Sequence, residues 1–313
     1  MLAVVYDERF QPLARIRKRT KAYEGAESGL ARIVEMIRAA LDEAAVTPDR
    51  VRGVGIGCPG PLDVNRGVIL DAPNLGWKQV PLRAELGKAL GAPVVVANDV
   101  DTGVYGEYRF GAAKNARCVL GVFPGTGIGG GMVYEGRIFS GASRTCVEVG
   151  HIQVMPGGPL CGCGHHGCLE AVASRLAVAA AAAQAAQRGQ APNLREAAGT
   201  DLAKIRSGVL AAAIEAGDKV IEQIVRDAAR HIGTAVAGVV HLIAPDVIVL
   251  GGGLVEAMPK LYVETVTEAA QARVLPAYTD GFRVVAAALS DDATALGAAA
   301  WARENVGRQT EAS

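Results

Sequence analysis

The sequence predicts an α/β fold, because short apolar runs typical of strands alternate with amphipathic, helix-like segments from one end of the chain to the other. The chain has 313 residues, half of them apolar, with 39 glycines and few aromatic residues. That length is enough to bury a sizeable core in two domains or in one large one. No low-complexity linker separates the two halves, and the second half repeats the strand–helix alternation of the first.

In the first half, strands are predicted over residues 2–6, 13–19, 51–57 and 93–97. Helices are predicted over residues 29–45, 81–90 and 100–108. The first helix rests on Leu30, Ile33, Val34, Ile37 and Leu41, which recur at the spacing of one helical face. The second begins at a proline, a residue favoured in the first turn of a helix.

In the second half, strands are predicted over residues 117–123, 130–134, 246–250 and 282–287. Helices are predicted over residues 169–188, 202–216, 218–242 and 293–305. The longest carries Val220, Ile221, Ile224, Val225 and Ile232 along one face, the pattern of a helix that covers a core.

Composition disfavours nucleic-acid and membrane partners. Lys+Arg and Asp+Glu both number 32, the formal net charge is zero, and no basic block or acidic tail stands out. The first residues have no charged segment or cleavage pattern typical of a signal peptide. Apolar stretches such as residues 232–244 are too short or too alanine-rich to span a bilayer. We therefore expect a soluble, cytoplasmic protein.

Three of the six cysteines, Cys161, Cys163 and Cys168, lie in one glycine-rich loop. Nothing indicates export, so metal binding is a better interpretation than disulfides. A structural zinc ion takes four nitrogen or sulfur ligands. His151, His165 and His166 are the local candidates for the fourth, and we favour His151, because the loop can fold back onto it. The alternative is three reduced thiols packed in a loop.

A second motif is the glycine-rich run at residues 125–131, Gly-Thr-Gly-Ile-Gly-Gly-Gly. It satisfies the G-x-G-x-x-G pattern of dinucleotide folds, but that pattern must open a helix, and this run lies between two predicted strands. A glycine-rich turn there suits close approach of backbone amides and Thr126 to phosphates. The alternative is a tight hairpin with glycines at positive φ.

Further candidate polar residues lie near these motifs. Asn98 and Asp99 follow a valine-rich strand, at the end where ligands gather in open α/β sheets, and a carboxylate there is well placed to act as a base. The alternative is a cap for the helix that follows. Glu148 and Glu170 flank the cysteine loop. Residues 251–253, three glycines after a buried strand, suit either a helix start or the floor of a nucleotide site.

Taken together, the chain resembles the ROK family of sugar kinases and sugar-responsive repressors. The matching stretches occur in family order along almost the whole chain: residues 57–62, 72–77, 98–101, 125–131, 148–151, 161–170 and 249–253. The resemblance implies a two-domain actin/hexokinase-like (ribonuclease H-like) fold with a cleft between the domains. The small α/β domain would comprise residues 1–108, closed by a C-terminal helix over residues 293–313, and the large domain with the zinc loop residues 109–292.

The resemblance also implies roles for individual residues. Asp99 would be the general base that takes the proton from the sugar 6-hydroxyl. The sugar would be bound by Asn98, Glu148, His151 and Glu170. ATP would be bound by Gly125, Thr126, Gly127, Gly129, Gly251, Gly252 and Gly253. Structural zinc would be bound by His151, Cys161, Cys163 and Cys168, with one ring nitrogen of the histidine on the metal and the other on a sugar hydroxyl.

The expected activity is that of a transferase in carbohydrate metabolism and glycolysis, a glucokinase that uses ATP with Mg²⁺. Kinases for N-acetylglucosamine, N-acetylmannosamine, mannose or fructose are alternatives, as are polyphosphate as the donor and a non-catalytic sugar sensor. The resemblance further implies a homodimer. It also implies a strand and an Asp-x-Gly-Gly-Thr-Lys phosphate loop ahead of Leu2, which the sequence does not contain; we expect that the start codon was assigned too late.

Overall fold

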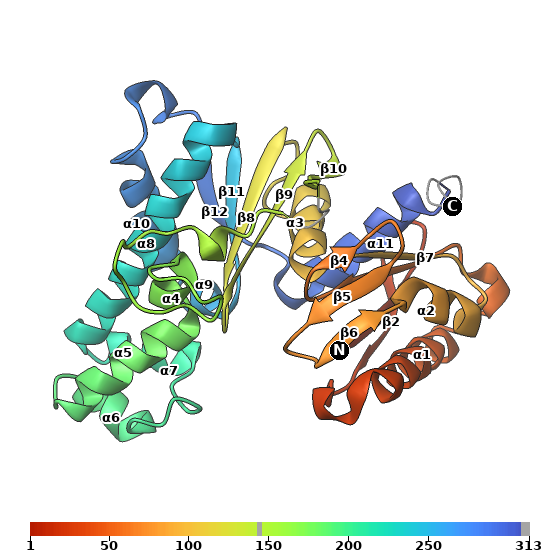
Figure 1. Cartoon of the computed structure of the whole chain (residues 1–313), viewed down its shortest axis with the longest axis horizontal. Helices are drawn as coiled ribbons and strands as arrows, with labels where there is room; N and C mark the ends of the chain where they lie inside the picture. Colours follow the sequence, from red (N-terminus) through yellow and green to blue (C-terminus); the bar gives the residue numbers. More distant parts are fainter. Residues whose placement is uncertain (143–145, 308–313) are drawn as a thin grey trace. The chain divides into compact units, whose positions relative to one another are not determined.

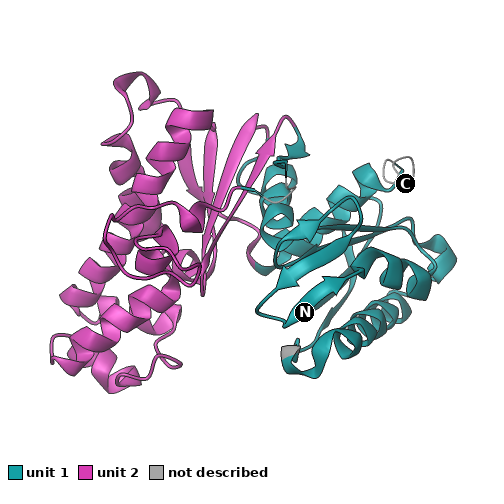
Figure 2. Ribbon diagram, viewed as in Figure 1, with its two compact units in different colours: residues 1–114, 136–146, 291–313 teal, residues 115–135, 147–290 magenta. Residues whose placement is uncertain are grey.

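The structure is a computed structural model that describes residues 1–142 and 146–307 (Figure 1). The chain divides into two compact units, unit 1 with residues 1–114, 136–146 and 291–313, and unit 2 with residues 115–135 and 147–290 (Figure 2). The predicted α/β class is confirmed. The domain limit expected at residue 108 falls inside a helix, and residues 136–146 pack with unit 1.

Unit 1 contains four α-helices and eight strands among its described residues. They are β1 (Leu2–Tyr6), β2 (Pro12–Arg17), α1 (Gly25–Glu43), β3 (Val54–Cys58), β4 (Leu62–Asp63), β5 (Val68–Ala72), β6 (Trp77–Val80), α2 (Leu82–Leu90), β7 (Val94–Asn98), α3 (Asp99–Arg109), β10 (Arg137–Ile138) and α11 (Ala293–Asn305). β1 and β2 pair antiparallel, and β3 and β7 pair parallel as a separate ladder. The expected C-terminal helix over residues 293–313 thus ends at Asn305; residues 308–313 lie outside the described part.

Two predictions for unit 1 were incomplete. Helix α1 begins at Gly25 rather than at residue 29. Strands β4, β5 and β6 form a three-stranded antiparallel ladder that the sequence did not predict. Their stretch is rich in Pro, Asn and Gly, residues that indicate loops when only local propensity is considered.

Close contact between backbones holds α3 against α11. A methyl group at Gly297 would lie 1.8 Å from the carbonyl oxygen of Thr102, and one at Gly106 would lie 2.3 Å from that of Ala293. A methyl group at Gly55 of β3 would lie 1.9 Å from the carbonyl oxygen of Ala298. Only glycine allows this approach. Beside it, the buried Tyr105 donates a hydrogen bond of 2.6 Å to Glu304.

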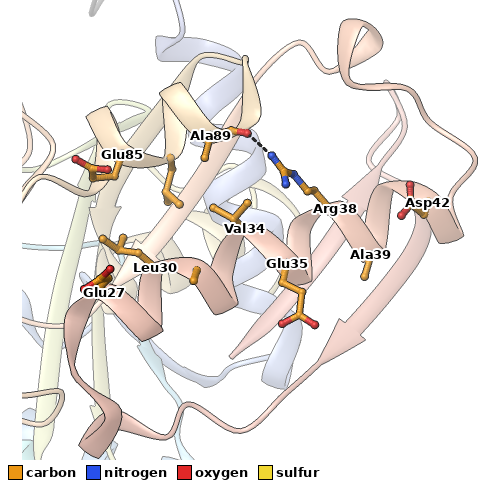
Figure 3. A pocket seen from close by; sticks show the side chains of 11 residues that line it. Glu27, Leu30, Val34, Glu35, Arg38, Ala39, Asp42, Glu85 and Ala89 are labelled. Carbon is orange, nitrogen blue, oxygen red and sulfur yellow. Dashed lines mark hydrogen bonds between the residues drawn. The ribbon is translucent and has the colours of Figure 1, made fainter.

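A groove of about 670 Å³ runs between α1 and α2 (Figure 3). Leu30, Val34 and Leu86 line it, with acidic residues such as Glu27 and Glu85 beside them. The Arg38 guanidinium donates to the carbonyl oxygen of Ala89 at 2.8 Å and joins the two helices. None of the candidate site residues lies in the lining of this groove.

Unit 2 is built on a sheet in which β9, β8, β11 and β12 lie side by side in that order. β8 and β9 form an antiparallel hairpin, whereas β11 runs parallel to both β8 and β12. The described elements are β8 (Cys118–Pro124), β9 (Ile128–Tyr134), α4 (Leu169–Ala173), α5 (Arg175–Gln187), α6 (Pro192–Ala198), α7 (Ser207–Glu215), α8 (Lys219–Ile243), β11 (Val247–Leu250), α9 (Gly253–Ala257), α10 (Pro259–Gln271) and β12 (Arg283–Ala286).

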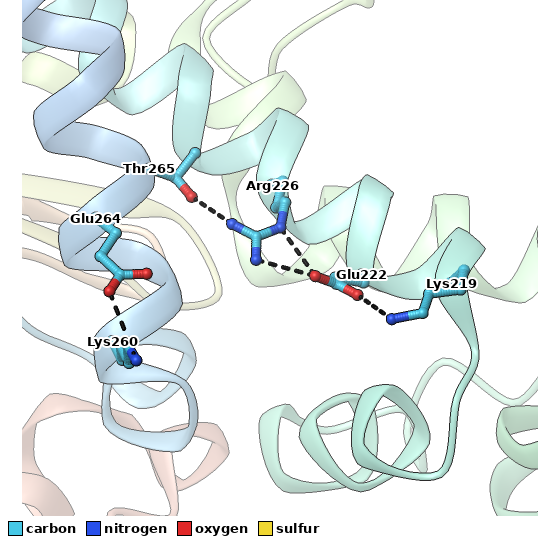
Figure 4. A network of polar contacts seen from close by, with 6 residues as sticks. All are labelled: Lys219, Glu222, Arg226, Lys260, Glu264 and Thr265. Carbon is cyan, nitrogen blue, oxygen red and sulfur yellow. Dashed lines mark hydrogen bonds and ion pairs between the residues drawn. The ribbon is translucent and has the colours of Figure 1, made fainter.

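Helix α8 is the central helix of unit 2. Its predicted apolar face is confirmed, because Ile221, Val225, Ile232 and Val236 are all buried. It packs against α10, and the Arg226 side chain bridges the pair by donating to Glu222 of α8 and to the buried Thr265 of α10 (Figure 4). Because the Arg226 guanidinium has a hydrogen-bond acceptor on each helix, burying it between α8 and α10 costs little free energy.

Two helix predictions for unit 2 need correction. The segment 169–188 is not one helix, because Ser174 adopts an extended conformation and divides it into α4 and α5, with its side chain capping α5 through the amide of Ala177. The helix predicted over residues 202–216 begins only at Ser207. Helices α6 and α10 were not predicted, and α9 begins at Gly253, where a helix start was one of two alternatives.

One stretch, Leu169–Gln187, has the length and mean hydropathy of a membrane span. The break at Ser174 leaves neither part near the roughly 20 residues that a spanning helix needs. Ala173, Ala179, Ala182 and Ala186 are buried in the core of unit 2. The high hydropathy of this stretch is therefore explained by burial of its alanines in the core of unit 2.

We expect Gly297→Ala to lower the free energy of unfolding by about 1–3 kcal/mol or more, because the added methyl group meets a backbone carbonyl that cannot move without its helix. Gly238→Ala is the matched control: Gly238 is exposed in the middle of α8 and a methyl group there meets nothing within 4 Å. That variant should gain about 0.5–1 kcal/mol. Urea denaturation measures both, and equal stabilities would contradict this account of the packing of α3 against α11.

Candidate functional site

The junction of β7 and α3 in unit 1 carries the predicted catalytic base. Asn98 is the N-cap of α3, and its Oδ1 accepts from the amides of Val100 at 2.8 Å and Asp101 at 3.2 Å. Asp99 follows as the first residue of the helix, and its Oδ1 accepts from the amide of Val100 at 3.0 Å. The capping role considered for this dipeptide therefore belongs to Asn98.

Burial raises the pKa of Asp99 above its usual value of 3.8, while hydrogen bonds from the backbone amides partly offset the rise. A raised pKa makes a carboxylate a better proton acceptor near neutral pH. The neighbouring Cys58 is buried, and its burial, together with the charge of Asp99, raises the pKa of the thiol. Cys58 is therefore a neutral neighbour of the carboxylate.

Two threonines that the sequence analysis missed hold the backbone of Asp99. The carbonyl oxygen of Asp99 accepts from the Thr102 hydroxyl at 3.0 Å and from the Thr294 hydroxyl at 3.2 Å. Gly57 lies beside them, and a methyl group there would come within 2.5 Å of the Thr102 hydroxyl. Local sequence gives no signal for Thr294, because it reaches Asp99 from the other end of the chain.

In unit 2, the glycine-rich run forms the turn between β8 and β9, where Pro124 pairs with Ile128. The hairpin interpretation is therefore correct in outline, but none of the described glycines at residues 125–131 has a positive φ. Two of them, Gly127 and Gly130, are needed for close approach instead. A methyl group at Gly127 would lie 2.3 Å from a carboxylate oxygen of Glu170, and one at Gly130 would lie 2.4 Å from the carbonyl oxygen of Val147.

Two side chains outside the hairpin fix its tip. Glu170, in the first turn of α4, accepts from the amide of Ile128 at 3.0 Å. The amide of Arg175, the first residue of α5, donates to the carbonyl oxygen of Gly125 at 2.8 Å, and its guanidinium donates to the Thr126 hydroxyl at 3.0 Å. The sequence analysis did not predict the contribution of Arg175. Thr126 itself is exposed at the tip of the turn.

Glu148 precedes a short 3₁₀ turn, η3 (Val149–His151), and His151 is its last residue; both side chains are exposed in unit 2. The residue before Glu148 is strained: Val147 has φ 63, a region that β-branched residues rarely adopt. Gly150 packs against the carbonyl oxygen of Ile128, where a methyl group would come within 2.2 Å. Backbone strain of this kind is concentrated at functional sites, which supports a role for Glu148.

The structure brings together His151, Cys161, Cys163 and Cys168, whose ligand atoms all lie within 4.8 Å of one another. Cys161 Sγ lies 3.7 Å from His151 Nδ1, and Cys163 Sγ lies 3.7 Å from Cys168 Sγ. Sulfur ligands about 3.8 Å apart are expected around a tetrahedral zinc ion with Zn–S bonds near 2.3 Å. The donor set and spacing therefore fit Zn²⁺. Of the other candidates, His166 turns to the carbonyl oxygen of Gly158 at 3.0 Å.

The three thiols differ in how readily they lose a proton. Hydrogen bonds from the backbone and ring of His165 lower the pKa of Cys163 to about 6. Burial raises the pKa of Cys161, and it raises that of Cys168 to about 12. A thiolate is the form that binds metal. One carboxylate links this cluster to the hairpin, since Cys161 Sγ also lies 3.8 Å from Glu170 Oε1.

The second glycine segment, residues 251–253, lies beside the hairpin. β8 and β11 run parallel with Val122 opposite Leu250, so both glycine segments follow the carboxyl ends of adjacent strands. Methyl groups at Gly251 and Gly252 would clash with Phe123 and Pro124 of β8. Gly253 begins the short helix α9. A cavity of about 180 Å³ adjoins them, lined by Gly251, Glu256, Ala287 and Ser290 among others.

Unit 1 thus holds a buried carboxylate, and unit 2 holds a glycine hairpin, a second glycine segment and a thiol cluster. These are the features expected, from the resemblance, of an actin/hexokinase-like phosphotransferase. The chain matches the ROK family over residues 1–305, and it belongs to that family. Its glucokinase homologues and the glucokinase structures that it resembles support a sugar kinase, a phosphotransferase with an alcohol group as acceptor.

Two relatives bear on its activity. A glucokinase of Thermotoga maritima is 33% identical over 94% of this chain and 91% of its own length. The solved structure of a ROK family glucokinase from Streptomyces griseus, in complex with glucose and AMPPNP, has a TM-score of 0.83 at 31% identity and covers 96% of this chain and 95% of its own. Regulators are similar too: the DNA-binding transcriptional repressor Mlc of Escherichia coli is 30% identical over 80% of this chain and 60% of its own length.

We expect the purified protein to carry about one zinc ion per chain, measured by plasma mass spectrometry, and Cys163→Ser to lose most of it, because three ligands hold zinc less tightly than four. Cys146→Ser is the control, since Cys146 lies outside the cluster. Full zinc content in Cys163→Ser, or equal loss in both variants, would contradict this ligand set.

Proposed function

We propose that the chain transfers the terminal phosphoryl group of ATP to the 6-hydroxyl of a hexose, and that glucose is the preferred hexose. The observation that carries the proposal is Asp99, a buried carboxylate with a raised pKa at the start of α3. Proton abstraction from a hydroxyl needs such a base, and an exposed carboxylate with its usual pKa would be weaker. Glucose is favoured because relatives of high coverage are glucokinases.

In the proposed reaction, Asp99 accepts the proton of the sugar 6-hydroxyl. The hydroxyl oxygen forms a bond to the terminal phosphorus of ATP, and the bond from that phosphorus to the bridging oxygen breaks, which releases ADP. Asp99 Oδ1 is held by the amide of Val100, so the other carboxylate oxygen takes the proton. The protein does little covalent chemistry in such a transfer, and positioning and charge stabilisation dominate.

The donor site is assigned to unit 2. Gly125, Thr126, Gly127 and Gly129 would contact the phosphates of ATP through backbone amides and the threonine hydroxyl. Gly251, Gly252 and Gly253, with the cavity beside them, would contact the adenosine. Mg²⁺ bound with ATP supplies positive charge to the phosphates.

The resemblance assigns four residues to sugar binding. Asn98 Nδ2 would donate to one hydroxyl, and Glu148, His151 and Glu170 would bind others. Carboxylates accept hydrogen bonds from hydroxyl groups, so a polyhydroxylated ligand suits them. His151 Nδ1 faces Cys161 in the thiol cluster, which assigns Nε2 to the sugar. Zinc would fix this part of the sugar site without taking part in the chemistry.

A non-catalytic sugar sensor is the second candidate, and the similarity to Mlc favours it. N-acetylglucosamine, N-acetylmannosamine, mannose and fructose stay alternative substrates, and polyphosphate stays an alternative donor. The homodimer, the cytoplasmic location and the absence of nucleic-acid and membrane partners stay predictions.

We expect ADP release in a coupled assay with Mg·ATP and glucose, at a kcat/KM at least about tenfold above that with N-acetylglucosamine, mannose or fructose, because one well-placed hydrogen bond provides a selectivity of this order. Zinc-loaded protein is used throughout. If kcat/KM is highest with another sugar, that sugar is the preferred substrate and the proposal of glucose is wrong. Sugar binding by calorimetry without turnover on any of them would support the sensor instead.

Asp99→Asn should lower kcat by about 10² or more with little change in sugar affinity. In the wild-type enzyme, kcat/KM should fall with decreasing pH through a pKa above 3.8, the usual value, because burial raises that of Asp99. The variant should lack this acidic limb. Wild-type turnover in Asp99→Asn would exclude Asp99 as the base.

The same variant should be at least as stable as the wild type at pH 7. The pKa of Asp99 is raised in the folded state, so the stability that this group contributes is present at low pH and is lost as pH rises through the folded-state pKa. At neutral pH the charged carboxylate is therefore destabilising, and the neutral amide removes that cost. A melting temperature clearly below that of the wild type would contradict this reasoning.

A further inference from the structure

We propose that Arg175 binds the phosphates of the nucleotide directly, as a cationic partner of the glycine hairpin in unit 2. The inference rests on the proposed use of ATP and adds to it a residue that no glycine-loop pattern indicates. It concerns only groups within unit 2, which all lie close together around the tip of the β8–β9 turn.

The position of Arg175 is fixed by its backbone and its side chain together. It is the first residue of α5, and its amide donates to the carbonyl oxygen of Gly125 at 2.8 Å. Its Nη2 donates to the Thr126 hydroxyl at 3.0 Å. The guanidinium is therefore held at the tip of the turn from which the hairpin amides would approach a phosphate.

The charge of Arg175 has no counterpart within the part of the chain that the structure describes: no carboxylate there forms an ion pair with it within 4.0 Å. A guanidinium has five N–H donors, and Thr126 accepts from one of its nitrogens. The remaining donors form the planar fork that matches phosphate oxygens. The hairpin itself supplies only neutral donors, namely amides and one hydroxyl.

The contact with Thr126 has a second effect. When the threonine oxygen accepts a hydrogen bond from Arg175, the hydroxyl hydrogen is turned away from the guanidinium and is free to donate. Thr126 is exposed at the tip of the turn, so this hydrogen can point to the same phosphate group. The pair then acts as two donors aimed at one anion.

The test measures nucleotide affinity by calorimetry, with Mg²⁺ present, for ATP, ADP and adenosine. Arg175→Gln should weaken ATP binding by about tenfold or more, since hydrogen bonds to charged groups contribute about that much, and should leave adenosine binding unchanged. Arg175→Lys, which keeps the charge, should recover part of the loss. Arg188→Gln is the matched control, an exposed arginine at the other end of α5, and should bind ATP as the wild type does.

A double variant separates direct binding from an effect through the threonine. If Arg175 binds phosphate, Arg175→Gln should weaken ATP binding further in a Thr126→Val background. A double variant no weaker than Thr126→Val, equal losses for ATP and adenosine, or unchanged ATP affinity in Arg175→Gln would each overturn the proposal. So would a wild-type chain that binds no ATP. A chain that binds ATP but phosphorylates no sugar would refute the kinase proposal, and the affinities would still decide the role of Arg175.

Discussion

The close approach of α3 to α11 is the constraint on which the arrangement of unit 1 depends. Gly106 and Gly297 let the two helices meet backbone to backbone, and Gly55 lets β3 join them. The first turn of α3 carries Asp99, and its carbonyl oxygen is tied to Thr294 at the start of α11. A carboxylate that is buried at a cost to stability stays in place only if its backbone cannot relax. The glycine contacts supply that rigidity.

In unit 2, Glu170 has a corresponding role. One of its oxygens accepts from the amide of Ile128 at the hairpin, and the other lies near Cys161 of the thiol cluster. The carboxylate thereby connects the glycine hairpin, the thiol cluster and the start of α4. A sugar hydroxyl bound by Glu170 would share that carboxylate with the hairpin amide, so sugar and nucleotide sites would have one residue in common. When one residue contacts both ligands, few other groups determine the distance between them, which favours accurate positioning.

The sequence was sufficient where the signal is local. Apolar runs predicted four of the eight described strands of unit 1 and all four strands of the sheet of unit 2. The apolar pattern also placed a helix over residues 293–305, where α11 lies, whereas the resemblance extended it to residue 313. The sequence failed where tertiary contacts decide. The break at Ser174 lies in an alanine-rich stretch whose helix propensity is uniformly high, so no local signal marks it. Gly127 and Gly130 of the hairpin are required by the close approach of Glu170 and Val147 and not by a positive φ. Thr294 and Arg175 carry no pattern of their own, because their roles come from residues far away in the chain.

The two units differ in when they can be completed as the chain is synthesised. The four proposed metal ligands lie between His151 and Cys168, so they leave the ribosome almost together, and unit 2 is finished by residue 290. Unit 1 begins at the first residue but needs α11, which ends at Asn305. Helix α3 is synthesised much earlier, but the side of it that carries Gly106 is covered only when α11, the last helix of the chain, has been synthesised. Unit 1 is therefore completed only after unit 2 has been synthesised, although its first strands are translated first. A chain that ended before α11 would keep the four proposed metal ligands but would lack the contact from Thr294 to the carbonyl oxygen of Asp99.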